Sequence, residues 1–232
     1  MIDDTYTVYN LAEKGSNPTD TLPFIDEFIL EKPTIIFYGF SYRDFNVEKI
    51  ESNILPDPNH EFTKIIENID PKLNTINPKS ATLKIIRNSF QNEVIFPDDT
   101  DEIITILNDT QLRNQVHLSD APKLHIPSSD VNKRVKDMEK IISKVQDNNI
   151  KLILFVAPLN EHYLEIIPES EKNSFNLIVQ ELSKKYNVEI YDYSDKYVGL
   201  PIWADLVHVA YNKNAIIYSE DVAKIIINEI GK

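Results

Sequence analysis

The chain has 232 residues, enough for one sizeable domain, and its 42% hydrophobic and 26% charged residues are typical of a globular protein. A formal net charge of −13, from 37 Asp plus Glu against 24 Lys plus Arg, repels polyanions and argues against nucleic acid as a partner. The absence of Cys excludes disulfides and thiolate chemistry, and the 4 Gly form neither of the common glycine-rich phosphate loops, so we expect no cofactor.

The N-terminal segment predicts a β-α-β unit. Residues 5–9 (TYTVY) form a β-rich run, followed by an amphipathic helical pattern that Thr19 or Asp20 can cap. Residues 34–38 (TIIFY) are apolar and β-branched between a proline and Gly39, which is typical of a buried strand. Because such crossovers join parallel strands, we expect the two strands to be parallel.

The middle of the chain, residues 46–130, is the least regular. Short helical patterns near 61–69, 80–90 and 100–113 are separated by prolines. We interpret the whole stretch as an irregular helical insertion, or a lid over the sheet, within a single domain spanning 1–232. The alternative, a separate subdomain, lacks a continuous apolar pattern long enough to build its own core.

The C-terminal half alternates helices and strands. An amphipathic helix is expected from Val131, a central strand at 150–157 (IKLILFVA), a helix at 171–186, a strand at 188–193 and a final helix ending near Ile230. This alternation predicts an α/β fold, a three-layer α/β/α sandwich of flavodoxin-like type with a mostly parallel sheet. The carboxyl ends of the strands are where such sheets carry their chemistry.

An Asp-x-x-His pattern follows the last predicted strand. Asp205 lies three residues before His208, and a carboxylate at this spacing can orient an imidazole as a general base. The same spacing at Asp57 and His60 lies between prolines with no strand leading into it, so we set it aside. The alternative interpretation is that Asp205 caps the final helix and His208 is an ordinary surface residue.

Two further candidates follow the other strands. Ser41 comes just after strand 34–38, in a turn where many hydrolases place a nucleophile. On the residues alone we favour a turn serine that satisfies backbone groups. His162 and Asn160 lie in the loop after 150–157, but His162 has no metal-ligand partner at a recognisable spacing, so we predict a substrate-lining or plain loop residue and no metal site.

The order of these segments resembles the SGNH (GDSL-like) hydrolase superfamily. Within it, the chain is most similar to the branch of D-alanyl transfer proteins and alginate O-acetyltransferase-like proteins. Asp205 and His208 match the family's last block, Asp-x-x-His, and the segment IKLILFVAPLNEHY resembles the penultimate strand and loop, whose polar residues, here Asn160 and His162, face the site. The resemblance implies the SGNH fold and an acyl-ester hydrolase or O-acyltransferase.

The N-terminal half aligns with this family in two ways. In one alignment, Gly39-Phe-Ser41 is the first block and Ser41 is the nucleophile. In the other, VYNLAEKGSNPTDTL is the second block, with Gly15 as its oxyanion glycine, and KPTIIFYGFSYRDF is the third. We favour the second alignment, because this branch joins its second and third blocks with a loop, a helix and a Lys-Pro strand start.

The favoured alignment places Ser41 on the oxyanion side, near the position of the family's asparagine. Arg43 and Asp44 then replace the family's Asn-Asp pair, and the nucleophile block would precede Met1. In SGNH sheets the first strand lies between the second and third. A chain lacking it must pair 5–9 directly with 34–38 or leave backbone groups unpaired, so we expect either a disturbed sheet edge at 5–9 or a natural start further upstream.

Three hypotheses remain. The first is an SGNH-type hydrolase or O-acyltransferase acting on a small-molecule, glycan or cell-envelope ester, with His208 as base and Asp205 fixing its tautomer. The second is a non-catalytic binding or assembly module that keeps the fold without a nucleophile. The third is another flavodoxin-like protein in which the Asp205/His208 pair is incidental.

The residues do not reveal where the protein is located, and only the resemblance bears on its location. No apolar run approaches the ~20 residues that span a bilayer, and the N-terminus lacks the features of a signal peptide. Members of this branch are usually anchored and face outward. Membrane association is therefore expected only if an anchor lies upstream of the sequence.

Overall fold

The computed structural model describes residues 11, 15–47 and 104–230. The chain divides into two compact units, one made of 1–6, 13–49 and 97–232 and the other of 7–12 and 50–96. Every described helix and strand belongs to the first unit. The strand predicted at 5–9 and the helical patterns at 61–69 and 80–90 lie outside the described residues.

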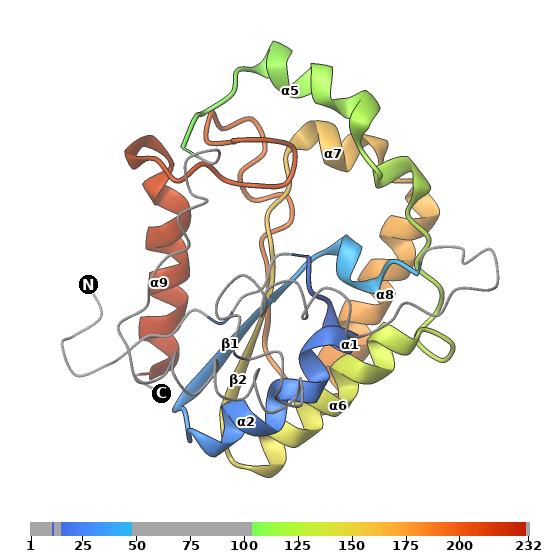
Figure 1. Cartoon of the computed structure of the whole chain (residues 1–232), viewed down its shortest axis with the longest axis vertical. Coiled ribbons are helices and arrows are strands. Elements are labelled where there is room, and N and C mark those ends of the chain that lie inside the picture. Colours follow the sequence, from blue (N-terminus) through green and yellow to red (C-terminus); the bar gives the residue numbers. More distant parts are fainter. Residues whose placement is uncertain (1–10, 12–14, 48–103, 231–232) are drawn as a thin grey trace, which may run out of the picture. The chain divides into compact units, whose positions relative to one another are not determined.

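The described strands form one parallel sheet in the order β1-β2-β3 (Figure 1). They are β1 (Ile35–Phe40), β2 (Lys151–Val156) and β3 (Ile190–Asp192). The mixed α/β fold with a parallel sheet, predicted from the sequence, is thereby confirmed. The first of these strands runs two residues further than predicted, so Gly39 lies inside it, opposite Phe155, instead of ending it.

The helix predicted before β1 forms as three short pieces: α1 (Pro18–Thr21), a 3-10 turn (Leu22–Phe24) and α2 (Ile25–Leu30). Asn17, and neither Thr19 nor Asp20, is the N-cap. Its side chain accepts a hydrogen bond from the Thr19 N–H, while the Asp20 carboxylate accepts one from the Asn17 N–H. Pro23 has no N–H to donate, which favours a break at this point.

Five further α-helices follow in the described part of the chain: α5 (Asp109–Gln115), α6 (Lys133–Asp147), α7 (Glu161–Ile166), α8 (Glu169–Tyr186) and α9 (Ile216–Ile230). The predicted start of α6 was too early. Asn132 caps it, accepting from the N–H groups of Arg134 and Val135, and Val131 is exposed instead of buried. Asn187 ends α8 in the left-handed conformation, with φ of 48°.

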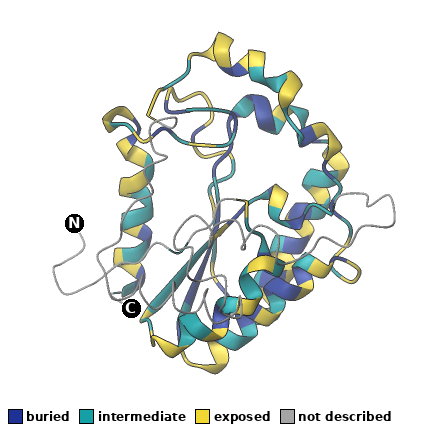
Figure 2. Ribbon diagram, viewed as in Figure 1, coloured by how far each residue is buried: buried dark blue, intermediate teal, exposed yellow. Residues whose placement is uncertain are grey.

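Alternate residues of β2 enter two separate apolar clusters, as the two-residue period of a strand requires. Leu152, Leu154 and Val156 belong to the large cluster that contains the buried residues of α6 and α8. Ile153 and Phe155 instead pack with Ile225 of α9 in a smaller cluster. Buried residues accordingly concentrate along β2 and on the inner sides of α6 and α8 (Figure 2).

Part of the predicted insertion contributes to this core. Leu112 of α5 and the loop residues Ala121, Leu124 and Ile126 are buried in the large cluster. Residues 104–130 therefore belong structurally to the same unit as the sheet. The insertion or lid predicted over 46–130 otherwise falls on residues outside the described ranges and stays a prediction.

A buried carboxylate joins α1 to α6. The side chain of Asp137 is 2% exposed and accepts hydrogen bonds from Lys133, from Lys140 at 2.8 Å and from the Thr19 hydroxyl at 2.9 Å. Burial raises the pKa of Asp137, but these three donors outweigh burial, so the pKa is lowered overall. The carboxylate is therefore held ionised in the folded chain.

We expect Asp137→Asn to lower the free energy of unfolding at pH 7 by about 1–3 kcal/mol, because the buried charged acceptor of three hydrogen bonds is lost. Since the folded pKa is lowered, this contribution is complete above the unfolded pKa of about 3.9 and is lost as the pH falls through the folded value. Urea unfolding at pH 7 and pH 3 checks both points. Asp147→Asn, at an exposed position of the same helix, should change stability by less than about 0.5 kcal/mol.

Candidate functional site

Backbone hydrogen bonds join the loops that follow the three strands. The Ala157 N–H donates to the Phe40 carbonyl at 2.8 Å, just beyond β1 and β2. The Leu159 N–H donates to the Ser194 carbonyl at 3.0 Å, and the Asn160 N–H donates to the Leu206 carbonyl at 3.1 Å. The carboxyl edge of the sheet thus gathers the segments that carry Ser41, Asn160 and His208.

Asp205 and His208 form a hydrogen-bonded pair at this edge. The Nδ1 of His208 lies 2.7 Å from Oδ2 of Asp205, and the imidazole side chain is 53% exposed. A carboxylate can only accept, so Nδ1 carries the proton and donates it, which leaves Nε2 as the basic nitrogen when the ring is neutral. Within 15–47 and 104–230, no residue hydrogen-bonds this Nε2.

The other carboxylate oxygen of Asp205 is fixed by the backbone. Oδ1 accepts hydrogen bonds from the N–H groups of Val207 and His208, both at 2.7 Å. Burial raises the pKa of Asp205, but the hydrogen bonds from His208 and from the Val207 N–H outweigh it, and the pKa is lowered. The carboxylate is therefore ionised at neutral pH, as the orienting partner of an imidazole must be.

The loop that carries this pair is itself braced. Trp203, which is 1% exposed, forms an antiparallel bridge with Val209, and the Ala204 N–H donates to the His208 carbonyl at 2.9 Å. The alternative interpretation, in which Asp205 caps the final helix, is wrong on this point. Asn212 caps it instead, because its side chain accepts from the Asn214 N–H in the 3-10 turn that leads into α9.

Ser41 lies directly after β1 and caps a 3-10 turn (Tyr42–Phe45). Its hydroxyl donates to Oδ2 of Asp44 at 2.9 Å, and its N–H donates to the same oxygen at 2.7 Å. Burial raises the pKa of Asp44 even though both Ser41 bonds oppose the shift. The described contacts of Ser41 are thus those of a capping serine, and none of its hydrogen bonds is with His208.

The other residues predicted near the oxyanion side have separate positions. Arg43 forms an ion pair with Asp120, with 3.1 Å between Nε and Oδ2. Gly39 is an exposed strand residue, and space for a side chain is open there. Gly15 is exposed in a turn with φ of 77°, a conformation that favours glycine.

Asn160 is fully buried and caps α7. Its side-chain oxygen accepts from the His162 N–H at 2.9 Å, and its amide nitrogen donates to Glu161 at 3.1 Å. Through its own N–H it also holds the Leu206 carbonyl in the loop that carries His208. These contacts show that Asn160 positions both the start of α7 and the loop that carries His208.

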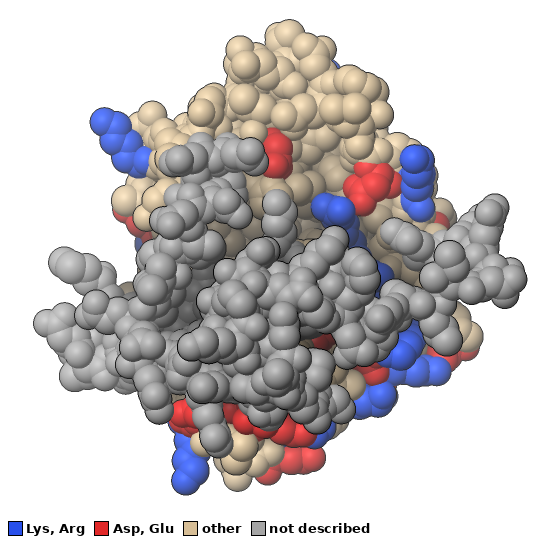
Figure 3. All heavy atoms as spheres, viewed as in Figure 1, with Lys and Arg blue, Asp and Glu red and all other residues tan. Residues whose placement is uncertain are grey.

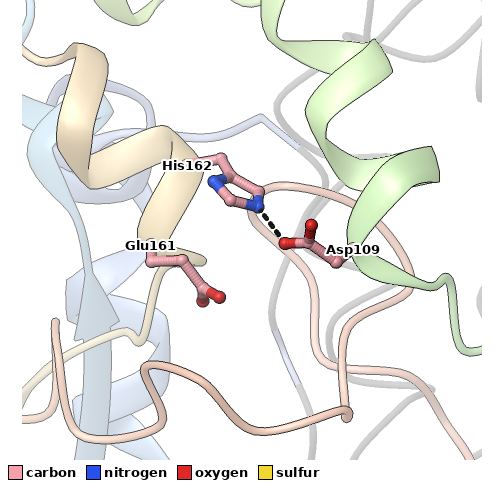
Figure 4. A group of neighbouring side chains, drawn as sticks. All are labelled: Asp109, Glu161 and His162. Atoms are coloured by element: carbon pink, nitrogen blue, oxygen red, sulfur yellow. Dashed lines mark hydrogen bonds and ion pairs between the residues drawn. The ribbon is translucent and has the colours of Figure 1, made fainter.

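His162 is buried in the first turn of α7, where its side chain is 2% exposed. Its Nε2 lies 2.7 Å from Oδ1 of Asp109, the first residue of α5 (Figure 4). The pKa of Asp109 is lowered by hydrogen bonds from Arg113 and from His162. Sequence reasoning missed this pair, because the two residues are 53 positions apart and no spacing pattern connects them.

In the described ranges, one group of side chains offers ligand atoms close enough to share a metal ion: Asp109, Glu161 and His162. The sequence offered only indirect indications of this group of possible metal ligands. Asp109 and Glu161 each follow an asparagine that caps a helix, and acidic residues are favoured in a first helical turn in any case.

No known family model matches the chain, and no curated protein matches it.

We expect Asn160→Ala to lower the free energy of unfolding by about 1–2 kcal/mol, because α7 loses its N-cap. Asn160→Ser keeps an oxygen that can accept from the first turn and should lose less. Chemical denaturation of the three proteins checks this order. If the serine variant is as unstable as the alanine variant, the capping bond is not what Asn160 contributes.

Proposed function

We propose that the chain is an SGNH-like domain, a three-layer α/β/α sandwich that supports acyl-ester hydrolysis or O-acyl transfer. The observation that carries this proposal is the Asp205–His208 pair: an exposed imidazole held by an ionised carboxylate at the carboxyl edge of a parallel sheet. The resemblance of the segment order to SGNH hydrolases supports it independently of the geometry. The substrate we propose is an ester of a small molecule, a glycan or a cell-envelope polymer.

The chemistry assigned to this pair is general base catalysis. Nε2 of His208 takes the proton of a hydroxyl as that oxygen attacks the ester carbonyl, and it returns the proton to the departing alcohol. Asp205 keeps the ring in the required tautomer and stabilises the imidazolium that forms. Ser41 would serve as the nucleophile only after its hydroxyl leaves Asp44 and turns to His208.

A second function is favoured by one specific observation. The Ser41 hydroxyl is engaged by Asp44 within its own 3-10 turn, as expected for a structural cap. In the alignment that places Ser41 on the oxyanion side, the described residues supply a base without a nucleophile. This favours a binding or assembly module that retains the site of an SGNH enzyme.

The charge of the chain favours a substrate that is not a polyanion. On the coloured part of the face shown in Figure 3, basic and acidic side chains lie next to one another. The net charge of −13 points the same way.

None of the described helices combines the length and the apolar character that crossing a membrane requires.

The test is hydrolysis of p-nitrophenyl acetate by the full chain and its variants. If His208 is the base, His208→Gln should lower the rate by at least about 100-fold, the usual contribution of general base catalysis. His117→Gln is the matched control, because His117 is also exposed and would report any unspecific reaction of an imidazole with this ester. Equal rates for wild type and His208→Gln would contradict the proposal.

Labelling with a fluorophosphonate probe separates the two functions. Labelling of wild type that is lost in Ser41→Ala identifies Ser41 as the nucleophile. A wild-type chain that neither hydrolyses the ester nor takes up the probe supports the binding module instead.

A further inference from the structure

Three ligand atoms meet between α5 and α7. One oxygen each of Asp109 and Glu161 and one ring nitrogen of His162 lie within 4.8 Å of one another (Figure 4). Asp109 and Glu161 are the first residues of their helices, and His162 follows Glu161 directly. Two carboxylates and one imidazole are donors that first-row divalent cations such as Zn²⁺ accept.

The buried ring of His162 supplies a second, independent observation. Its Nδ1 is buried and has no hydrogen-bond partner. The Nε2 is directed at Asp109, whereas the other nitrogen points away from both carboxylates of the group (Figure 4). With the Nε2 proton donated to Asp109, a neutral ring leaves a buried Nδ1 lone pair without a hydrogen-bond donor, which is costly.

We propose that Asp109, Glu161 and His162 bind one divalent cation of the Zn²⁺ class, with His162 contributing Nε2. Binding there displaces the proton from Nε2 and places it on Nδ1. One acceptor close to Nδ1 is Oε2 of Glu165, at 3.7 Å, on the exposed side of α7. A small rotation of Glu165 then completes the carboxylate–histidine–metal arrangement common at zinc sites and satisfies the buried nitrogen.

Neighbouring groups already orient both carboxylates. Arg113 holds Oδ2 of Asp109 at 2.8 Å, which leaves Oδ1 directed at His162. Oε2 of Glu161 accepts from the Gly199 N–H at 3.2 Å and from Asn160 at 3.1 Å. Such outer contacts fix ligands in place at metal sites.

The three ligand atoms need to move only slightly closer together to coordinate one Zn²⁺ ion. Ligand atoms arranged tetrahedrally about Zn²⁺ at about 2.1 Å lie roughly 3.4 Å from one another. The Asp109 carboxylate is 61% exposed and that of Glu161 is half-buried, so both can adjust around the fixed imidazole. Three protein ligands leave a fourth position for water or another ligand.

This site is independent of the proposed ester chemistry, and its test is metal binding. The full chain, freed of metal by dialysis against EDTA, is titrated with ZnCl₂ in a calorimeter. We expect wild type to bind one equivalent. Asp109→Asn and His162→Gln should bind it at least about 100-fold more weakly, and Glu165→Ala, which removes the acceptor for Nδ1, about 10- to 100-fold more weakly. MgCl₂ should compete poorly, because Mg²⁺ prefers all-oxygen ligands.

Two controls keep the result interpretable. His208→Gln removes the exposed imidazole of the other pair and should bind Zn²⁺ as wild type does. Circular dichroism shows whether each variant is folded, and Asp109→Asn, at an exposed side chain, tests the site even if His162→Gln fails to fold. The proposal is overturned if wild type takes up no stoichiometric Zn²⁺, or if Asp109→Asn binds it as tightly as wild type.

Discussion

The candidate site depends on the hydrogen bonds that the Asp205 carboxylate accepts. This carboxylate accepts three hydrogen bonds, one from the His208 ring and two from the backbone of its own loop, so the same group shapes the loop and orients the imidazole. Because these donors lower its pKa, it stays charged at neutral pH and can stabilise a positive ring. This arrangement supports the proposal that His208 acts as a base, but it does not identify a nucleophile.

The parallel sheet places that loop beside the others. Strands β1, β2 and β3 run in one direction, so their carboxyl ends share an edge, and backbone hydrogen bonds from Ala157, Leu159 and Asn160 connect the segments that leave it. Asn160 links two sites, because its N–H holds the His208 loop while its side chain contacts Glu161 and His162. The proposed ester site and the proposed metal site thus share a structural support, Asn160, and have no residue in common.

The sequence predicted features that local patterns determine. Strands β1 and β2 are continuous apolar runs, and the spacing of Asp205 and His208 was visible because three residues separate them. The start of α6 was misplaced, since several residues before Asn132 are equally good caps. The contact between Asp109 and His162 could not be predicted, because it joins the first turns of α5 and α7 across 53 positions of the chain and not through any sequence spacing.

The most direct test of the central claim is the tautomer of His208, measured by long-range ¹H–¹⁵N NMR on the full chain, with His208→Gln to assign the signal. With the ring neutral, our expectation is a protonated Nδ1 and an unprotonated Nε2, and loss of this preference in Asp205→Asn. A neutral ring protonated at Nε2 in the wild type would contradict it, because such a ring neither donates to Asp205 nor offers a base to a substrate.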